Sequence, residues 1–288
     1  MNQSQYEALT IQDDFMFKKV MQCKRICMRL ISEIMQVEVR DITYLETEKT
    51  IEAYIEGLGI RLDVLVADDK GTHYNIEMQV RNTIGTSTGK ALLPKRTRYY
   101  QGSIDTDMLQ KGQNFDELPP LVLIFICAFD LFDQNRYLYE FKSRCTEDYE
   151  LVLDNEVTVM FLNALGHRGN VSQLVKNFLQ YVNDHVPKDD FTNEVEDEVV
   201  RLNHDKEVRR EFMVLSTRLK DERMLGIEEG RVEGRVEGRV EGKAEKAQEV
   251  AMNMLKDGVA LGLIKRYSNL SEAEIRSIAQ ANGFEVKE

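Results

Sequence analysis

The sequence predicts an α/β fold in which helices flank a mixed central sheet and a helical extension follows toward the C-terminus. An amphipathic helical pattern near the N-terminus precedes two alternating segments, an apolar run follows at 121–129, and charged helical sequence dominates beyond residue 170. The apolar run has about half of the roughly 18 residues that a transmembrane helix needs, so we expect no membrane span.

Each expected element follows from a local pattern. Apolar residues at helical spacing predict a helix over 13–36, and period-two alternation predicts strands at 60–68 and 72–80. A helix is expected from about Pro94, and the apolar run, which follows two prolines, is typical of a fully buried strand. Shorter strands are expected at 39–45, 137–142 and 157–163. We divide the chain into a core at 1–165, a helical extension at 166–225, a repeat linker at 226–242 and a small helical unit at 243–288.

Charge and cysteine content narrow the class of protein. With 38 Lys and Arg against 50 Asp and Glu, the net charge of −12 argues against general coating of nucleic acid or membrane by the whole surface. The N-terminus lacks the basic-then-apolar layout of a signal peptide. No Cys-x-x-Cys pair occurs among the four cysteines, so we expect no zinc site and reduced thiols in a cytoplasmic protein.

The segment 230–241 repeats Gly-Arg-Val-Glu three times. A four-residue period advances a helix by about 400°, so each repeat drifts by about 40°, and each glycine costs about 1 kcal/mol of helix stability. Small residues at this spacing also permit close helix contact. The repeat is therefore either a marginal helical linker or a surface for self-association, which could make a dimer through the C-terminal helical region. We expect the small helical unit after it to dock a partner rather than to bind DNA.

Two carboxylates carry the main functional signal. Asp69-Lys70-Gly71 is typical of a three-residue hairpin loop, and pairing Asp68 with Thr72 places Asp63 directly across from Glu77. Like charges about 5 Å apart between Cβ atoms destabilise a sheet unless a proton, a basic side chain or a divalent cation intervenes. Gln79 adds a polar group on the same face, and hard oxygen ligands on rigid strands suit Mg²⁺. The alternative is an ordinary hairpin with its charged side in water.

The next segment is locally basic. Between Met78 and Ile104 the chain has no Asp or Glu, although it is acidic overall. Such a segment beside a carboxylate pair could hold a phosphodiester against a metal, or could be an ordinary solvated basic helix. The five basic residues are Arg81, Lys90, Lys95, Arg96 and Arg98.

Asp14 is the remaining candidate. It lies three residues before Phe17, so we expect it along the core-facing side of the first helix, as an outer metal ligand or water-orienting group. A helix cap is the alternative for this residue.

These residues also carry a resemblance. Asp14-Phe15-Met16-Phe17-Lys18, Asp63 in an apolar strand and Glu77-Met78-Gln79 resemble the PD-(D/E)XK nuclease superfamily. Within it, the chain is similar to the Rpn family of bacterial recombination-promoting nucleases and transposases. The similarity continues through Arg98-Tyr99-Tyr100, Gly112, the strand at 118–129, Asp130-Leu131-Phe132, the glycine repeats and the terminal helical unit.

The resemblance implies a restriction-endonuclease-like core and Mg²⁺-dependent DNA cleavage, with Mn²⁺ able to substitute. Asp63 and Glu77 would be metal ligands, the Met78 carbonyl could contribute, and Asp14 matches the acid of the first helix. Gln79 occupies the lysine position of the superfamily. Because glutamine carries no charge, it can orient a water or donate a neutral hydrogen bond, and the metal must supply most of the charge stabilisation.

The leading hypothesis is thus a cytoplasmic DNA endonuclease. Asp63 and Glu77 hold the cation, Gln79 positions the attacking water and Asp14 supports the water shell, while Lys95, Arg96, Arg98 and Arg81 contact DNA phosphates. One rival is a degenerate nuclease fold that acts as a DNA-binding or oligomeric scaffold. A second rival is a glycosidase, since paired carboxylates also suit that chemistry, but the chain has no Trp to stack on a sugar.

Overall fold

The computed structural model describes residues 8–45, 50–51, 60–82, 91–109 and 112–287. The chain divides into two compact units, 1–212 and 213–288, and each is considered by itself. The sequence-based division into four segments stays a prediction.

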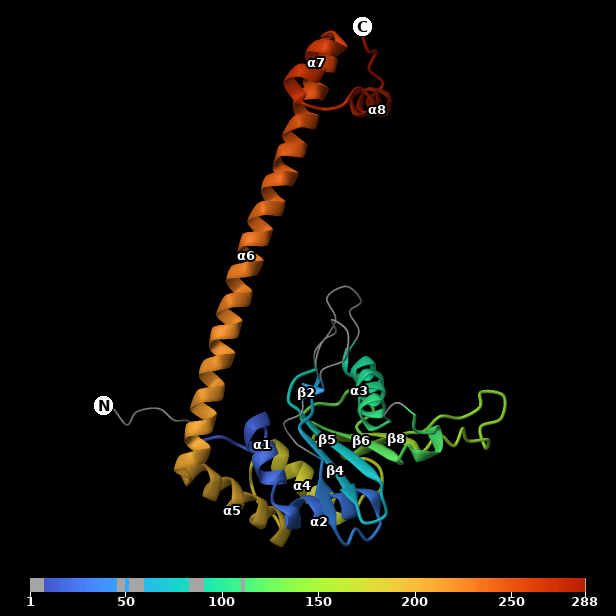
Figure 1. The fold of residues 1–288 in the computed structure, drawn as a ribbon, viewed down its shortest axis with the longest axis vertical. Coiled ribbons are helices and arrows are strands. Elements are labelled where there is room, and N and C mark those ends of the chain that lie inside the picture. The colour runs from blue at the N-terminus through green and yellow to red at the C-terminus, as the bar shows by residue number, and fades with distance from the viewer. Residues whose placement is uncertain (1–7, 46–49, 52–59, 83–90, 110–111, 288) are drawn as a thin grey trace, which may run out of the picture. The chain divides into compact units, whose positions relative to one another are not determined.

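The first unit is built on a mixed sheet (Figure 1). Among the described residues the sheet has six strands in the order β1-β4-β5-β6-β8-β7. The strands β5, β6 and β8 are parallel to one another, and the other pairs are antiparallel. The bounds are β1 (Ile42–Tyr44), β4 (Val64–Asp68), β5 (His73–Gln79), β6 (Leu121–Cys127), β7 (Leu138–Phe141) and β8 (Val157–Asn163). Two short strands, β2 (Thr50–Ile51) and β3 (Ile60–Arg61), pair separately.

Helices cover both faces of this sheet, which confirms the predicted fold class. One face packs against α1 (Asp14–Met21), α2 (Lys24–Met35), α4 (Gln173–Asp184) and α5 (Asp190–His204), and the other against α3 (Leu93–Met108). A 3₁₀ helix, η1 (Phe115–Glu117), precedes β6. Every residue of β6 is buried, and alternate side chains enter the two cores. A central parallel strand has no wet side, so its sequence is apolar throughout.

The helix expected over 13–36 is two helices, because the chain is extended at Cys23. This break changes the phase of the buried side chains. In α1 the buried stripe ends at Val20 and Met21, whereas in α2 it resumes at Ile26 and Cys27. On one continuous helix Ile26 would point about 120° away from Val20, so the core favours the break over the local helical pattern.

The strand expected over 60–68 is also interrupted, at Leu62 and Asp63. Leu62 therefore packs with Leu65 in the core below α3, whereas Val64 lies in the core on the opposite face. In an uninterrupted strand Leu62 and Val64 would share one face. The interruption leaves Asp63 outside the regular ladder, at the beginning of β4.

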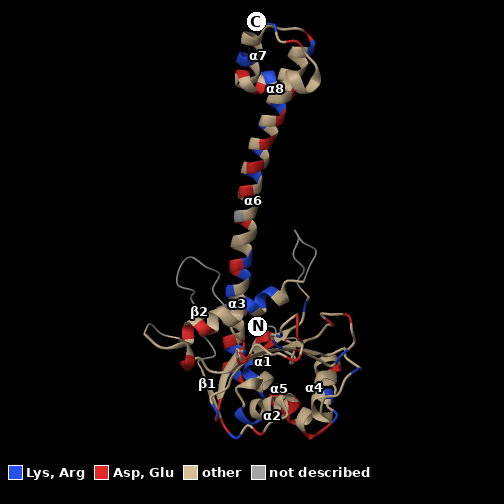
Figure 2. Ribbon diagram, turned by 90° about the vertical axis from the view of Figure 1, so that its right-hand side faces the viewer, with Lys and Arg blue, Asp and Glu red and all other residues tan. Residues whose placement is uncertain are grey.

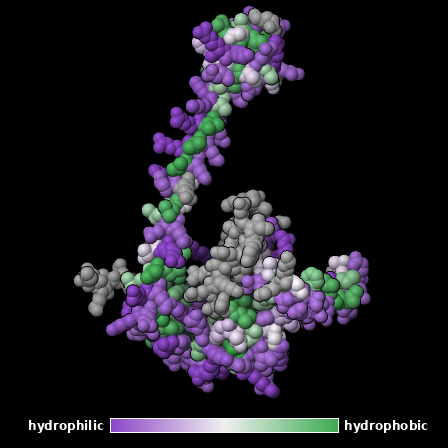
Figure 3. Space-filling model, viewed as in Figure 1, coloured by the Kyte–Doolittle hydropathy of each residue, from purple (hydrophilic) through white to green (hydrophobic). Residues whose placement is uncertain are grey.

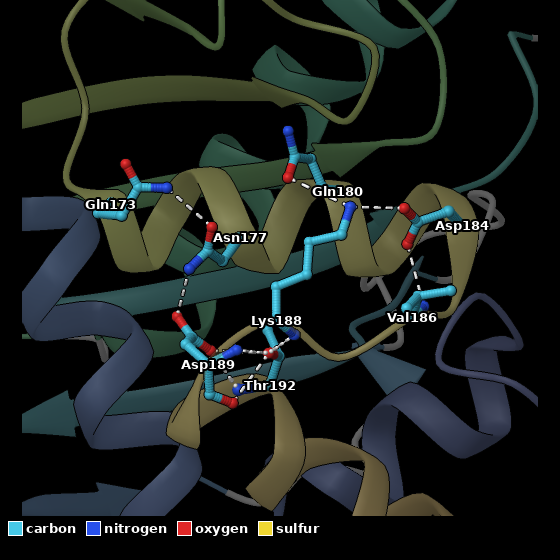
Figure 4. A network of polar contacts seen from close by, with 8 residues as sticks. All are labelled: Gln173, Asn177, Gln180, Asp184, Val186, Lys188, Asp189 and Thr192. Carbon is cyan, nitrogen blue, oxygen red and sulfur yellow. Dashed lines mark hydrogen bonds and ion pairs between the residues drawn. The ribbon is translucent and has the colours of Figure 1, made fainter.

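The turn between α4 and α5 is fixed by side-chain hydrogen bonds (Figure 4). The Asp189 carboxylate caps α5 by accepting from the N–H of Thr192 at 2.8 Å, and Thr192 Oγ1 accepts from the N–H of Lys188 at 2.8 Å. Asn177 on α4 donates to the same carboxylate at 2.8 Å. The two helices are thus tied together where α5 begins, which places Phe191 in the core.

The helix α6 (Lys206–Lys256) is continuous through the glycine repeat, and α7 (Leu261–Ser268) and α8 (Glu272–Asn282) follow it. Ser271 and Glu274 form a capping box at the start of α8. A small core joins the end of α6 to α7 and α8 through residues that include Leu255, Ile264 and Ile275. Along α6, basic and acidic residues alternate (Figure 2). Within the described ranges, no helix has the length and apolar character that are needed to cross a membrane.

Candidate active site

The β4–β5 hairpin has the predicted turn and register. Gly71 adopts a φ of 85°, and the N–H of Asp68 donates to the carbonyl of Thr72 at 2.9 Å. Val64 pairs with Ile76, and the same register places Asp63 opposite Glu77. A left-handed residue at the end of a three-residue loop is usually glycine, so Gly71 fixes the hairpin and, through it, the carboxylate pair of Asp63 and Glu77.

The carboxylate pair is buried rather than solvent-facing, which rules out the ordinary wet hairpin. Asp63 is 6% exposed and Glu77 is 2% exposed. The N–H of Asp63 donates to Glu77 Oε1 at 3.0 Å, and the N–H of Met78 donates to Asp63 Oδ2 at 3.0 Å. Each carboxylate thus binds the main chain at or beside its partner. Burial, and after it the negative charge of Asp63, raise the pKa of Glu77 well above its ordinary value.

Lys18 supplies a cation to this pair. Its Nζ lies 2.9 Å from Asp63 Oδ1, and the two side chains are 15% and 8% exposed. Lys18 belongs to α1, which covers the face of the sheet opposite α3. Spacing along the sequence does not reveal this contact of Lys18, because a contact between residues 18 and 63 depends on how a helix packs across a layer. The one signal was its place in the Asp14–Lys18 segment.

Gln79 is held by α3. Its Oε1 accepts from Arg96 Nη1 at 3.0 Å, and Arg96 Nη2 donates to Tyr100 Oη at 2.5 Å. The guanidinium also lies over the Tyr100 ring, 5.3 Å from its centroid. Burial and the negative charge of Glu77 raise the pKa of Tyr100 to about 12, so this phenol stays protonated at neutral pH. The arrangement leaves the amide N–H groups of Gln79 as its hydrogen-bond donors.

Asn75 is a further polar residue beside the carboxylate pair, and no sequence motif marks it as part of the site. It lies two residues before Glu77 on β5, so both side chains point to the same face, and it is fully buried. Neither amide atom of Asn75 has a hydrogen-bond partner among the described residues. Buried polar groups of this kind usually bind a water or an ion.

The residues present fit a hydrated divalent cation better than a fully protein-enclosed metal. The described part of the chain holds no group of three or more His, Cys, Asp or Glu side chains able to bind a metal. Mg²⁺ commonly takes one or two carboxylates and keeps several waters or phosphate oxygens. Asp63, Glu77 and the Met78 carbonyl meet that requirement, and Asn75 offers a partner for a bound water.

The basic residues predicted to bind phosphate divide into two groups. Arg96 is half-buried and points toward Gln79, whereas Lys95 and Arg98 are exposed on α3. Arg81 is exposed just beyond the end of β5. Lys90 lies outside the described residues. The structure thus brings Arg96 to Gln79, two residues after Glu77 on β5, and leaves the other three described cations on the surface.

Asp14 is the first residue of α1, and its side chain is exposed. It therefore lies outside the buried stripe of this helix, which Met16, Phe17 and Val20 form, and the expectation of a core-facing Asp14 is wrong. The N-cap is Asp13. Asp14 precedes Lys18 by one helical turn, so the two residues share one side of α1.

Comparison with known proteins identifies the family. A family model described as PD-(D/E)XK nuclease family transposase matches residues 11–185. The chain belongs to this family. Searches of the curated proteins and of the solved structures gave no match.

Membership in the PD-(D/E)XK family supports a nuclease or transposase-related function, and it implies DNA as the substrate. The matched region contains the whole sheet and every predicted site residue. PD-(D/E)XK nucleases typically use divalent metals, in agreement with the chemistry of the carboxylate pair. The mixed sheet between helical layers is consistent with a restriction-endonuclease-like core.

Proposed function

We propose that this protein is a Mg²⁺-dependent DNA endonuclease that hydrolyses phosphodiester bonds, and that its cleavage promotes DNA recombination or serves a mobile element. The observation that carries the proposal is the buried contact between Asp63 and Glu77. Gln79 lies two residues after Glu77 on β5, and its oxygen binds Arg96 of α3. Lys18 pairs with Asp63, which leaves Glu77 as a second buried carboxylate whose charge a bound cation would offset. The protein acts in the cytoplasm, where its four free cysteines stay reduced.

Asp63 and Glu77 hold the ion, together with the Met78 carbonyl. A bound divalent ion supplies charge stabilisation and lowers the pKa of a coordinated water. Gln79 orients the attacking water through its amide N–H groups, because Arg96 occupies its oxygen. Asp14, the first residue of α1, supports the outer water shell of the ion.

Basic side chains contact the DNA phosphates in two places. Arg96, which binds Gln79 on the same strand as Glu77, contacts the phosphate that is cleaved. Lys95, Arg98 and Arg81 are exposed and contact neighbouring phosphates, which set position and affinity without reading sequence.

Plasmid nicking tests this function. The purified full-length protein is incubated with supercoiled plasmid and Mg²⁺, and in parallel with Mn²⁺ or with EDTA. We expect nicking with either metal, and a loss of at least about 100-fold in Asp63→Asn, because even an outer-shell change typically costs about 10- to 100-fold. Equal nicking by the two proteins would defeat the assignment. Thr146→Ala, on an exposed loop, is the control for preparation quality.

A catalytically degenerate scaffold is the second candidate, favoured by the long repeat-bearing helix α6. Titration calorimetry separates the two. A nuclease must bind Mn²⁺ through the carboxylate pair, whereas a scaffold that only binds DNA need not do so.

We further propose that α6 pairs in parallel with α6 of a second copy. Val232, Val236 and Val240 are 53–62% exposed, and apolar residues form a row along α6 (Figure 3). In each repeat an arginine precedes the valine and a glutamate follows it. At 100° per residue these charges flank the valines on opposite sides, so parallel pairing sets arginines against glutamates, whereas antiparallel pairing sets like charges together.

A further inference from the structure

Both oxygens of the Asp63 carboxylate are already bound by the protein. Oδ2 accepts from the N–H of Met78 at 3.0 Å, and Oδ1 lies 2.9 Å from Lys18 Nζ. A divalent ion bound to Asp63 would therefore lie close to the ammonium of Lys18, which already binds the same carboxylate. Two positive charges at such a distance repel strongly where water is largely excluded.

Position 79 supplies no charge that could replace this cation. Gln79 is neutral, and its oxygen is bound to Arg96, which is itself held by Tyr100. Arg96 is thus fixed by two contacts from its own side of the sheet. The ammonium of Lys18 pairs with Asp63 at the end of a flexible four-carbon stem, so it can move without disturbing a network.

We propose that Lys18 is the resident counter-ion of Asp63, that a divalent ion displaces its ammonium from Oδ1, and that the displaced ammonium binds a phosphate oxygen of the DNA. This inference rests on the proposed metal site. Lys18 thereby fills two needs in turn. It neutralises a buried carboxylate before the metal binds, and it brings positive charge to the substrate that Gln79 cannot provide. No bond is made or broken in the exchange.

The first test compares metal binding in Lys18→Met with that of the wild type, by calorimetry with Mn²⁺ and no DNA. Removing the competing cation should tighten Mn²⁺ binding by at least about tenfold, which is about 1.4 kcal/mol. The same variant should melt at a lower temperature in EDTA, because Asp63 has lost its counter-ion. A merely structural lysine would weaken both properties, so the opposite directions are diagnostic.

Lys19→Met is the matched control. Lys19 is the next residue on α1 and is 19% exposed, but it pairs with Glu211 rather than with Asp63. We expect unchanged Mn²⁺ affinity in Lys19→Met and in the charge-preserving Lys18→Arg. If the wild type binds Mn²⁺ and Lys18→Met binds it no more tightly, the inference fails while the proposed function survives. If neither binds Mn²⁺, both fail.

The second test uses the wild-type protein and does not depend on a variant that folds. Lysine acylation is followed by mass spectrometry in EDTA, in Mn²⁺, and in Ca²⁺ with DNA. Lys18 should be protected in EDTA, should become several-fold more reactive with Mn²⁺, and should be protected again with DNA. Lys19 should not respond to Mn²⁺. Unchanged reactivity of Lys18 on addition of Mn²⁺ would overturn the displacement.

Discussion

The main-chain N–H of Asp63 donates a 3.0 Å hydrogen bond to Oε1 of Glu77, so one member of the carboxylate pair is anchored on the backbone of the other. Glu77 is 2% exposed, and burial together with the Asp63 charge raises its pKa. The fold without metal therefore carries an ionisable group in a site that disfavours its charged form.

Glu77→Gln should stabilise the metal-free protein. The amide oxygen still accepts from the N–H of Asp63, but the buried repulsion is gone. A gain on the order of 1 kcal/mol raises the melting temperature by about 2–4 °C in a domain of this size. Thermal melts in EDTA at neutral pH measure this gain, and a lower melting temperature for Glu77→Gln would contradict it. Nicking by this variant should nevertheless be lost.

The stabilisation by Glu77→Gln should also depend on pH. A carboxyl whose pKa is raised in the folded state contributes stability that is complete below its unfolded pKa and is lost as the pH rises through its folded pKa. Gln cannot titrate, so the difference in melting temperature between variant and wild type should grow from pH 5 to pH 8 in EDTA. A difference that is constant over this range would show that Glu77 does not titrate there.

Arg96→Lys should impair cleavage more than binding. The guanidinium reaches Gln79 and Tyr100 at once, and an ammonium cannot reproduce this fork. We expect nicking to fall by about 10- to 100-fold, the range that is typical when a supporting contact is lost. DNA affinity, measured by fluorescence anisotropy in Ca²⁺, should change by less than about threefold, since the charge is kept. Equal losses in both assays would assign Arg96 to binding alone.

Lys95→Met and Arg98→Met should show the reverse pattern. Both side chains are exposed on α3, so we assign them to phosphates away from the cleaved bond. Each substitution should lower the slope of log affinity against log salt concentration by about 0.9. The rate at which the bound complex nicks DNA should change little. Affinity is measured over a salt series, and single-turnover nicking gives the rate. An unchanged salt slope in both variants would remove α3 from the DNA interface.

The cysteines should divide by reactivity. Burial raises the pKa of Cys27 and of Cys127 to about 12, so neither forms appreciable thiolate at pH 8. Cys23 and Cys145 are partly exposed. Iodoacetamide at pH 8 should label Cys23 and Cys145 first in the native protein, and all four in urea, as read by peptide mass spectrometry. Early labelling of Cys27 would mean that the core between α2 and the sheet opens readily.

Pairing through α6 predicts that two neighbouring substitutions differ in their effect on the oligomeric state. Val236→Glu should reduce the mass measured by light scattering from that of a dimer to that of a monomer. Gly234→Ala, on the other side of the helix, should leave the mass unchanged and stabilise the helix by about 1 kcal/mol, since the added Cβ meets no atom within 4 Å. Dissociation by Gly234→Ala would place the glycine row, rather than the valine row, in the contact.

The sequence predicted those parts of the site that local geometry determines. Gly71 defined the loop, the loop defined the register, and the register brought Asp63 to Glu77. Alternation failed where the chain departs from regular structure, because nothing in the residues around Leu62 marks the interruption between β3 and β4. Packing between the helical layer and the sheet could not be predicted from the sequence either, because spacing along α1 does not indicate which strand end Lys18 contacts.

The side chain of Asp63 replaces a bond that the sheet ladder would otherwise have made, because its Oδ2 takes up the N–H of Met78 where the strand is interrupted. The residue thereby holds the end of β5 in place, in addition to its proposed role as a metal ligand. Substitutions at position 63 should therefore lower both the stability of the fold and the catalytic activity, whereas substitutions at position 77 should lower the activity alone. An inactive descendant that still folds should therefore have lost its glutamate first and kept its aspartate longest.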